Sequence, residues 1–108
     1  MSDFLRGIRE LIDSGDVRIS EHGYDRLAEE NIFSRDLIAN IFKAEIVEEY
    51  PDYPKGHCIL LLQRDRDGNP VHAVWGIAKG YNKPVVLITA YRPDSQRWDS
   101  NFLQRQSL

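Results

Sequence analysis

The sequence has a single cysteine, Cys58, among its 108 residues. One cysteine cannot form an internal disulfide, and its isolation excludes zinc sites built from several thiolates. No apolar stretch approaches the roughly 18 residues that a membrane-spanning helix needs. The first ten residues, MSDFLRGIRE, place charges where a signal peptide would have its apolar segment. We therefore expect one small cytoplasmic domain without a membrane segment, in which Cys58 is a buried, inert thiol.

Motifs that hold nucleotides or activate a serine nucleophile are also missing. The chain contains no P-loop, no Rossmann glycine pattern and no G-x-S-x-G sequence, which excludes the corresponding cofactor and hydrolase classes. Its histidines are His22, His57 and His72, and none of them has the H-x-H or H-E-x-x-H spacing of a metal site. The sequence therefore predicts neither a cofactor nor a bound metal.

The charge is unevenly distributed along the chain. The net charge is −3, but residues 1–54 carry 6 basic and 13 acidic groups, whereas residues 55–108 carry 8 basic and 4 acidic groups. This asymmetry is typical of a protein with a polyanion-binding face, and also of one whose acidic helices simply face solvent. If a polyanion binds, we expect it to contact the second half of the chain.

Hydrophobic spacing divides the chain into a helical part and a strand-rich part. Apolar residues recur at helical intervals between Phe4 and Ile12, and Ser20 and Ser34 are placed to cap two further helices, the first ending at Asn31. The apolar stripes expected to be buried on these two helices are Tyr24, Leu27 and Ala28, then Leu37, Ile38, Ile41 and Phe42.

After Ala44 the sequence favours strands. Residues 17–19 alternate as in a brief strand, and four longer strands are expected at residues 45–50, 57–64, 71–78 and 84–91. Their connections are short, which favours antiparallel pairing. We predict an α+β fold in which N-terminal helices pack on one face of a curved, mainly antiparallel four-stranded sheet.

Two residues of the second expected helix form a candidate anion site. His22 and Arg26 are four residues apart, so their side chains leave the same face of the helix. Arginine offers a planar fork to phosphate, and histidine exchanges protons near neutral pH. The alternative is that Arg26 pairs with an acid such as Asp25 or Glu30, while His22 caps the helix or packs against it.

Two further regions carry residues suited to chemistry. His72 begins the third long strand, where it is either a structural residue or an acid–base group. The segment TAYRPDSQRW follows the last strand and mixes aromatic with basic residues. Tyr91 and Trp98 can stack on bases while Arg92 and Arg97 contact phosphates, as in single-stranded RNA binding. The alternative is that both aromatic rings fold back over the sheet edge and the arginines face solvent.

The order of these motifs resembles that of a small bacterial family, domain of unknown function 4258. The resemblance rests on S-x-H-x-x-x-R (Ser20, His22, Arg26), Ile32, V-H-A-V (Val71 to Val74), T-A-Y-x-P (Thr89 to Pro93) and Trp98. It covers about 17–98 of a single domain spanning 1–108, with an N-terminal helix at 1–15 and a tail at 99–108. The family is similar in pattern to the BrnT and RelE toxins, which pack two helices on a curved antiparallel sheet and whose active members cleave RNA.

This resemblance implies a toxin-type RNA-binding protein or a metal-independent endoribonuclease, with RNA and an antitoxin-like protein as partners. In the enzyme, the RNA 2′-hydroxyl attacks the adjacent phosphate, an acid and a base move protons, and cations stabilise the charge. The alternative is a non-enzymatic protein-interaction module whose His/Arg/Tyr cluster is a structural core. The implied catalytic residues are His22, Arg26, His72 and Tyr91, and the implied RNA contacts are Lys79, Arg92, Arg97 and Trp98.

Overall fold

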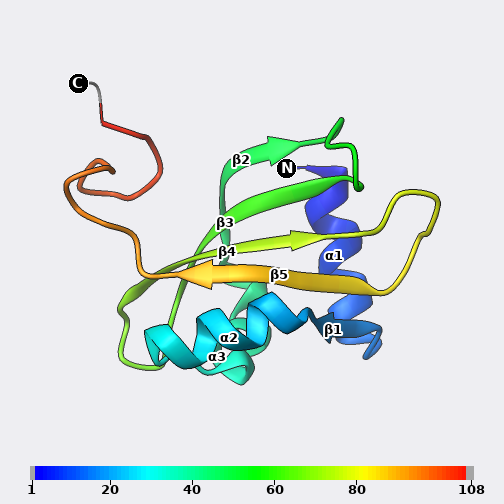
Figure 1. The fold of residues 1–108 in the computed structure, drawn as a ribbon, viewed down its shortest axis with the longest axis horizontal. Helices are drawn as coiled ribbons and strands as arrows, with labels where there is room; N and C mark the ends of the chain where they lie inside the picture. The colour runs from blue at the N-terminus through cyan, green and yellow to red at the C-terminus, as the bar shows by residue number, and fades with distance from the viewer. Residues whose placement is uncertain (1, 107–108) are drawn as a thin grey trace.

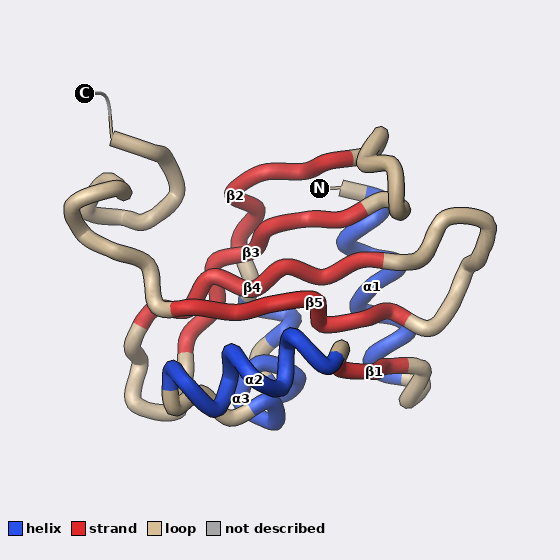
Figure 2. The backbone as a smooth tube through the Cα atoms, in the orientation of Figure 1, coloured by secondary structure: helices blue, strands red, loops and turns tan. Residues whose placement is uncertain are grey.

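A computed structural model describes residues 2–106 and has a five-stranded sheet in the order β1-β5-β4-β3-β2 (Figure 1). Helix α1 lies behind this sheet, and α2 runs along the β5 side (Figures 1 and 2). The elements in chain order are α1 (Asp3–Asp13), β1 (Val17–Ile19), α2 (Glu21–Glu30), α3 (Ser34–Ala39), the 3-10 helix η1 (Ile41–Lys43), β2 (Glu45–Tyr50), β3 (Cys58–Arg64), β4 (Pro70–Gly76) and β5 (Val85–Tyr91).

The boundaries of α2 follow from local hydrogen bonding. The Ser20 hydroxyl accepts a hydrogen bond from the Gly23 amide and caps the first turn. Asn31 ends the helix in the left-handed conformation, with a φ of 55°. Both predictions are therefore confirmed. The cap predicted at Ser34 is wrong by one residue, because Phe33 is the N-cap of α3 and no side chain bonds to the free amides there.

The α+β class is confirmed and the sheet is mainly antiparallel, but the predicted count of four strands is wrong, because the brief strand at residues 17–19 joins the same sheet. β1 adds a fifth strand, which pairs in parallel with β5 through Val17↔Val85 and Ile19↔Leu87. A parallel pair needs a long crossover connection. Here that connection comprises α2, α3 and strands β2 to β4. The short turns between neighbouring strands therefore could not predict the parallel pairing of β1 with β5.

The hydrophobic core lies between the helices and one face of the sheet. It contains Ile8 of α1 and Leu37 of α3, packed with alternate residues of the central strands such as Leu61 and Trp75. His72 lies between the core residues Val71 and Ala73 and therefore points to the opposite side of β4. We call that side of the sheet the open face.

After β5 the C-terminal segment leaves the sheet and loops beside it (Figure 1), and its Phe102 carbonyl contacts His72 on the open face. We call residues 94–106 the C-terminal strap. It is folded on itself by a bridge between Trp98 and Arg105 and by hydrogen bonds from the Gln106 amide group to the carbonyls of Ser95 and Trp98. Among the helices of residues 2–106, none has the length and apolar character required to cross a bilayer.

Candidate functional site

His72 is fully buried on the open face, and both nitrogens of its ring have partners. Nε2 lies 2.7 Å from the carbonyl oxygen of Phe102, and Nδ1 lies 3.2 Å from the hydroxyl of Tyr91. A carbonyl oxygen only accepts hydrogen bonds, so Nε2 carries the proton. The neutral ring therefore donates to Phe102 in the strap and accepts from Tyr91 in β5.

Two aromatic rings enclose the same imidazole. Trp98 meets it edge-on with 4.4 Å between ring centroids, and Tyr91 does so at 5.4 Å. Trp98 is itself buried, so the prediction that it folds back over the sheet describes its place in the structure. In this conformation His72 joins the strap to β5 and has no surface accessible to a ligand.

Burial also sets the protonation state of His72. Loss of hydration disfavours the charged ring and lowers the pKa of His72 below its ordinary 6.5, and the positive charge of Arg105 acts in the same direction. The bond to the Phe102 carbonyl and the charge of Glu48 oppose this effect without cancelling it. Burial likewise raises the pKa of the Tyr91 hydroxyl. Both side chains are therefore neutral at pH 7.

We expect the stability of the protein to fall at mildly acidic pH because of His72. Since its folded-state pKa is depressed, the unfolded chain takes up a proton first as the pH falls below about 6.5. The free energy of unfolding should then decrease by up to about 1.4 kcal/mol per pH unit. Urea denaturation between pH 7.5 and 5 measures this decrease.

Two histidine variants separate this effect from others. His72→Gln removes the titrating ring but keeps a hydrogen-bonding group, and it should flatten the dependence on pH. His22→Gln, which removes a histidine that is exposed on α2 and lies outside this cluster, is the matched control for the substitution itself. An unchanged slope in His72→Gln would contradict the expectation. The carboxyl groups with lowered pKa values, Asp36, Glu48 and Asp65, titrate below this window.

Next to this buried cluster, α2, β5 and the strap surround a cavity of about 280 Å³. We call it the arginine cavity. Four arginines and two carboxylates line it together with the Tyr91 and Trp98 rings, so basic side chains outnumber acidic ones in its lining although the chain as a whole is acidic. Its lining residues are Arg26, Glu30, Tyr91, Arg92, Asp94, Arg97, Trp98 and Arg105.

The arginines of the cavity differ in how firmly they are held. Arg26 pairs with Glu30 at 3.1 Å, one of the two partners that the alternative interpretation named, and also with the exposed Glu29 at 3.0 Å. Arg105 pairs with Glu48 of β2 at 3.0 Å. The Arg97 side chain is exposed and has no hydrogen bond or ion pair to another residue in 2–106. Arg97 is thus the guanidinium most available to an anion.

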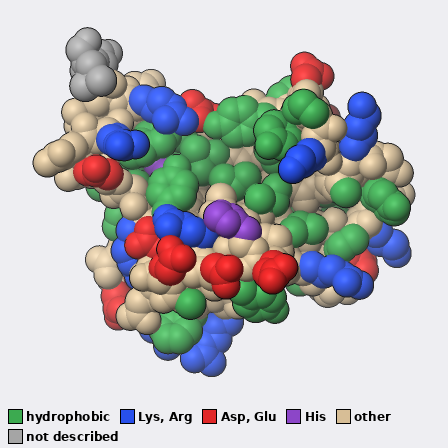
Figure 3. Space-filling model, viewed as in Figure 1, with side chains coloured by type: hydrophobic (Ala, Val, Ile, Leu, Met, Phe, Trp, Pro, Cys, Tyr) green, Lys and Arg blue, Asp and Glu red, His purple; other side chains and the backbone are tan. Residues whose placement is uncertain are grey.

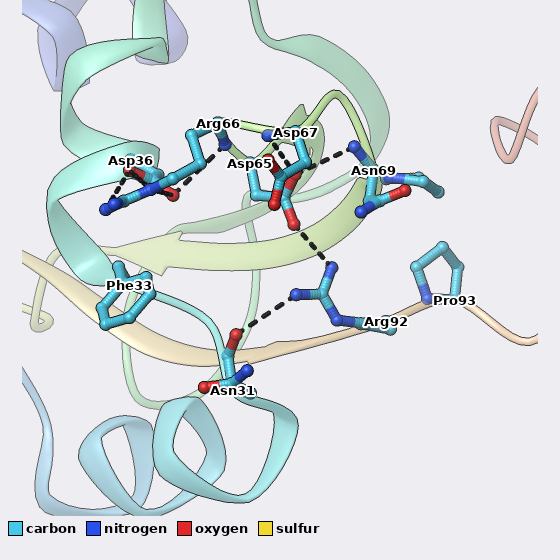
Figure 4. A pocket seen from close by; sticks show the side chains of 10 residues that line it. Asn31, Phe33, Asp36, Asp65, Arg66, Asp67, Asn69, Arg92 and Pro93 are labelled. Carbon is cyan, nitrogen blue, oxygen red and sulfur yellow. Dashed lines mark hydrogen bonds and ion pairs between the residues drawn. The ribbon is translucent and has the colours of Figure 1, made fainter.

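Arg92 is held by three acceptors. Its Nε donates to the carbonyl of Glu30 at 3.3 Å, one terminal nitrogen donates to the carbonyl of Asn31 at 3.2 Å, and the other lies 3.0 Å from the Asp65 carboxylate. The bonds to Asn31 and Asp65 border a second cavity of about 480 Å³ (Figure 4). Arg92 therefore ties the end of α2 to the loop between β3 and β4.

The loop that contains Asp65 keeps its carboxylate ionised for this contact. Burial favours its protonated form, but the backbone amides of Asn69 and Asp67 and the guanidinium of Arg92 all bond to the carboxylate. Their combined effect keeps the pKa of Asp65 below 3.8. The sequence alone does not indicate Asp65 as the partner of Arg92, because the two residues lie 27 positions apart.

The structure leaves three of the predicted site residues outside the arginine cavity, and His72, buried on the open face, is the first of them. His22 is exposed on α2, one helical turn from Arg26 and on the same side of the helix. Lys79 lies in the loop between β4 and β5, beyond the opposite end of β4. Arg105 lines the cavity but was not among the predicted residues. It is the one basic residue in the predicted tail, and only that isolated charge could have indicated it.

Cys58 and His57 are both held by contacts within the fold and do not line the arginine cavity. The Cys58 thiol is buried in β3, and burial raises its pKa, so it has the inert character that the sequence predicts. The His57 ring stacks on Phe4 at 3.5 Å between centroids, and its Nε2 lies 2.7 Å from Glu49. Within residues 2–106, no three His, Cys, Asp or Glu side chains are grouped as metal ligands.

The sequence profile of DUF4258, described as a domain of unknown function, matches residues 19–92. The chain belongs to the DUF4258 family. No curated protein and no solved structure matches it. In this DUF4258 protein the matched segment holds Arg26, His72 and Tyr91 and stops at Arg92, so it is shorter than the span to Trp98 that the motifs suggested. The strap lies beyond the matched residues.

Proposed function

We propose that this DUF4258 protein binds single-stranded RNA through the arginine cavity. The observation that carries the proposal is the lining of that cavity, where four arginines and the rings of Tyr91 and Trp98 meet in one wall. Phosphates bind arginine through charge-assisted, often bidentate hydrogen bonds, and the partly exposed ring of Tyr91 can stack on an unpaired base, whereas the buried Trp98 ring anchors the strap. A protein of net charge −3 thereby presents a local site of the sign that RNA requires.

The distribution of charge supports the same proposal. Arg92, Arg97 and Arg105 come from the basic second half of the chain, which is where the sequence analysis expects a polyanion to bind. Arg26 is the exception, and its side chain is about one-third exposed with two carboxylate partners. Exposed ion pairs of this kind contribute little to stability, so Arg26 can exchange a carboxylate for a phosphate at low cost.

A metal-independent endoribonuclease is the second candidate, in line with the resemblance to BrnT and RelE toxins and with an antitoxin-like partner. It is favoured by the presence of the Tyr91 ring in the cavity beside Arg26 and Arg92, with the exposed His22 one turn away. In such an enzyme His22 would take the proton from the RNA 2′-hydroxyl as base or give one to the leaving 5′-oxygen as acid, and the arginines would stabilise the phosphorane. The burial of His72 instead supports its role as a structural anchor, which the interaction-module alternative also requires.

Replacement of Arg97 by alanine tests the binding proposal. We expect the variant to bind a fluorescein-labelled single-stranded RNA several-fold more weakly, whatever its sequence, as measured by fluorescence anisotropy. The slope of log Kd against log salt concentration should fall by about 0.7, because one phosphate contact is lost. The matched control is Arg18→Ala, which removes an exposed arginine on β1 that does not line the cavity.

The outcomes are distinct. Equal weakening by Arg97→Ala and Arg18→Ala would show that only the overall charge matters, and it would reject the site. Absence of RNA binding by the wild type would reject RNA as the ligand and leave the interaction module. Incubation of the bound RNA with a metal chelator then decides between binding alone and cleavage, since the second candidate requires products that form in the presence of the chelator.

A further inference from the structure

We propose that the RNA strand held in the arginine cavity continues along the open face to a second contact site at the opposite end of the sheet. We call this site the lysine–tyrosine end and define it by Tyr53, Lys55, Lys79 and Tyr81. The inference rests on the proposed function and adds to it the path and the minimum length of the ligand.

The lysine–tyrosine end is built from two loops that are fixed to each other. Residues 51–57 connect β2 to β3, and residues 77–84 connect β4 to β5. The Lys79 amide donates to the carbonyl of Lys55 at 3.0 Å, and the Ile77 amide donates to that of His57 at 3.1 Å. Gly56 permits this approach, because a Cβ there would lie 2.1 Å from the Ile77 carbonyl oxygen.

The side chains of these loops suit a single-stranded polyanion. Tyr53 is 50% exposed and Tyr81 is 72% exposed, so both rings are open to stacking. The loops carry the exposed lysines Lys55, Lys79 and Lys83 against one acid, Asp52. Within residues 2–106 none of these lysines forms an ion pair. Positive charge and accessible aromatic rings are the two elements of sequence-independent binding to single strands.

Two adjoining cavities connect the open face with this end of the sheet. The first, of about 300 Å³, is mainly apolar and is lined by Gly76, Val86 and Ile88 together with Tyr53 and Lys55. Gly76 is four residues from His72 and therefore lies on the same face of β4. The second cavity, of about 390 Å³, shares Tyr53 with the first and is also lined by Lys79 and Tyr81.

The surface between the two sites is compatible with a nucleic acid strand. Figure 3 shows hydrophobic side chains across the middle of this face, with Lys and Arg side chains toward both sides. From His72 to the end of β4 at Gly76 the strand rises about 13 Å, and Lys79 lies in the loop beyond that end. Along one border, α2 carries Glu21 and Asp25, which would repel phosphates and so keep the strand on the sheet.

A comparison of two RNA lengths tests this inference. We would measure the binding of a labelled uridine trimer and of a uridine oligomer of about ten nucleotides by fluorescence anisotropy. Tyr81→Ala should weaken binding of the longer RNA about fivefold or more, the lower end of the effect of losing one stacked base. Lys79→Ala should weaken it several-fold and reduce its salt dependence. Neither variant should affect the trimer seated in the arginine cavity.

The controls separate this inference from the proposed function. Tyr24→Ala removes an exposed tyrosine of α2, and Lys43→Ala removes an exposed lysine of η1, and both variants should bind each RNA as the wild type does. If Arg97→Ala weakens the binding of both RNAs while Tyr81→Ala and Lys79→Ala weaken neither, RNA contact at the lysine–tyrosine end is rejected and binding in the arginine cavity stands. If the wild type binds neither RNA, the proposed function fails and the second contact site fails with it. Thermal melting confirms that each exposed-site variant is folded.

Discussion

Replacement of Trp98 by alanine is expected to release the C-terminal strap from the open face. Trp98 is buried, and its ring contacts His72 edge-on, so the substitution removes the largest apolar contact of the strap. Truncation of a buried tryptophan typically costs about 3–5 kcal/mol. The remaining contacts are the Phe102 carbonyl on His72 and the exposed pair of Arg105 with Glu48, which cannot replace that loss.

The loss should be local to the strap. Trp98 is not part of the cluster that contains Ile8, Leu61 and Trp75, and segments with few core contacts open with free energies below that of global unfolding. Hydrogen exchange should therefore speed up at the amides of Trp98, Asp99 and Phe102, while the amides of β3 and β4 keep their protection.

Release of the strap should also change His72. Water admitted to the ring removes the burial that lowers its pKa most, so the pKa of His72 should rise toward 6.5 although the bond to Phe102, which raises it, is lost; an NMR titration of the ring detects the rise. Trp98→Phe is the control, because it keeps an aromatic ring and should retain most of the protection. Unchanged exchange of the strap amides in Trp98→Ala would contradict the anchoring role given to this residue.

The helix boundaries could be predicted because their causes are local, but the buried faces could not. Ser20 and Asn31 act within one turn of α2. Tyr24, however, was expected in the core and is exposed, as is Ala28. The reason is that α2 packs against β5 through Gly23, where a Cβ would lie 2.7 Å from the Leu87 carbonyl oxygen, and through Leu27. Close backbone contact leaves α2 only a narrow buried stripe.

A change of helix type explains the other misplaced residue. Phe42 was assigned to the buried stripe of the third helix, yet its side chain is exposed. The α-helix ends at Ala39, and Ile41–Lys43 form a 3-10 turn. The apolar spacing of 3.6 residues per turn does not continue through that turn, because a 3-10 helix has three residues per turn. Leu37 and Ile41 are buried as predicted, since they precede or begin the turn.

The site was predicted in composition more than in arrangement. Tyr91, Arg92, Arg97 and Trp98 line one cavity because they are close in sequence. The partners that complete the cluster are far away: Phe102 lies 30 residues from His72, and Glu48 lies 57 residues from Arg105. These contacts depend on how the strap folds back, and the strap has no hydrophobic periodicity from which its path could be inferred.

Replacement of Arg92 by alanine is expected to destabilise the protein by about 2–3 kcal/mol. Removing one partner of a fully buried ion pair costs about 3–5 kcal/mol, and the value is reduced here because the Arg92 side chain is 35% exposed. Asp65 is only 8% exposed and would lose its cation, while the carbonyls of Glu30 and Asn31 would lose their donor. Urea denaturation measures the change in the free energy of unfolding.

The pair formed by Arg66 and Asp36 provides the matched control. It lies across the same cavity, its N–O distance is 3.1 Å, and Arg66 is more exposed than Arg92 (Figure 4). Arg66→Ala should therefore destabilise the protein much less than Arg92→Ala does. Arg92→Lys should recover less than half of the loss, because an ammonium group cannot span three acceptors as the guanidinium does. Equal losses in Arg92→Ala and Arg66→Ala would contradict the structural role of Arg92.

Acid provides an independent check on the same contact. The folded-state pKa of Asp65 is depressed below 3.8, so its carboxylate contributes stability above about pH 4, and that contribution is lost as the pH falls through the folded-state value. The difference in stability between the wild type and Arg92→Ala should therefore shrink at low pH. Part of this stability difference will remain at low pH, because the bonds of Arg92 to the Glu30 and Asn31 carbonyls do not depend on the charge of Asp65. The size of that remaining part separates the role of Arg92 in closing the end of α2 from its ion pair with the β3–β4 loop.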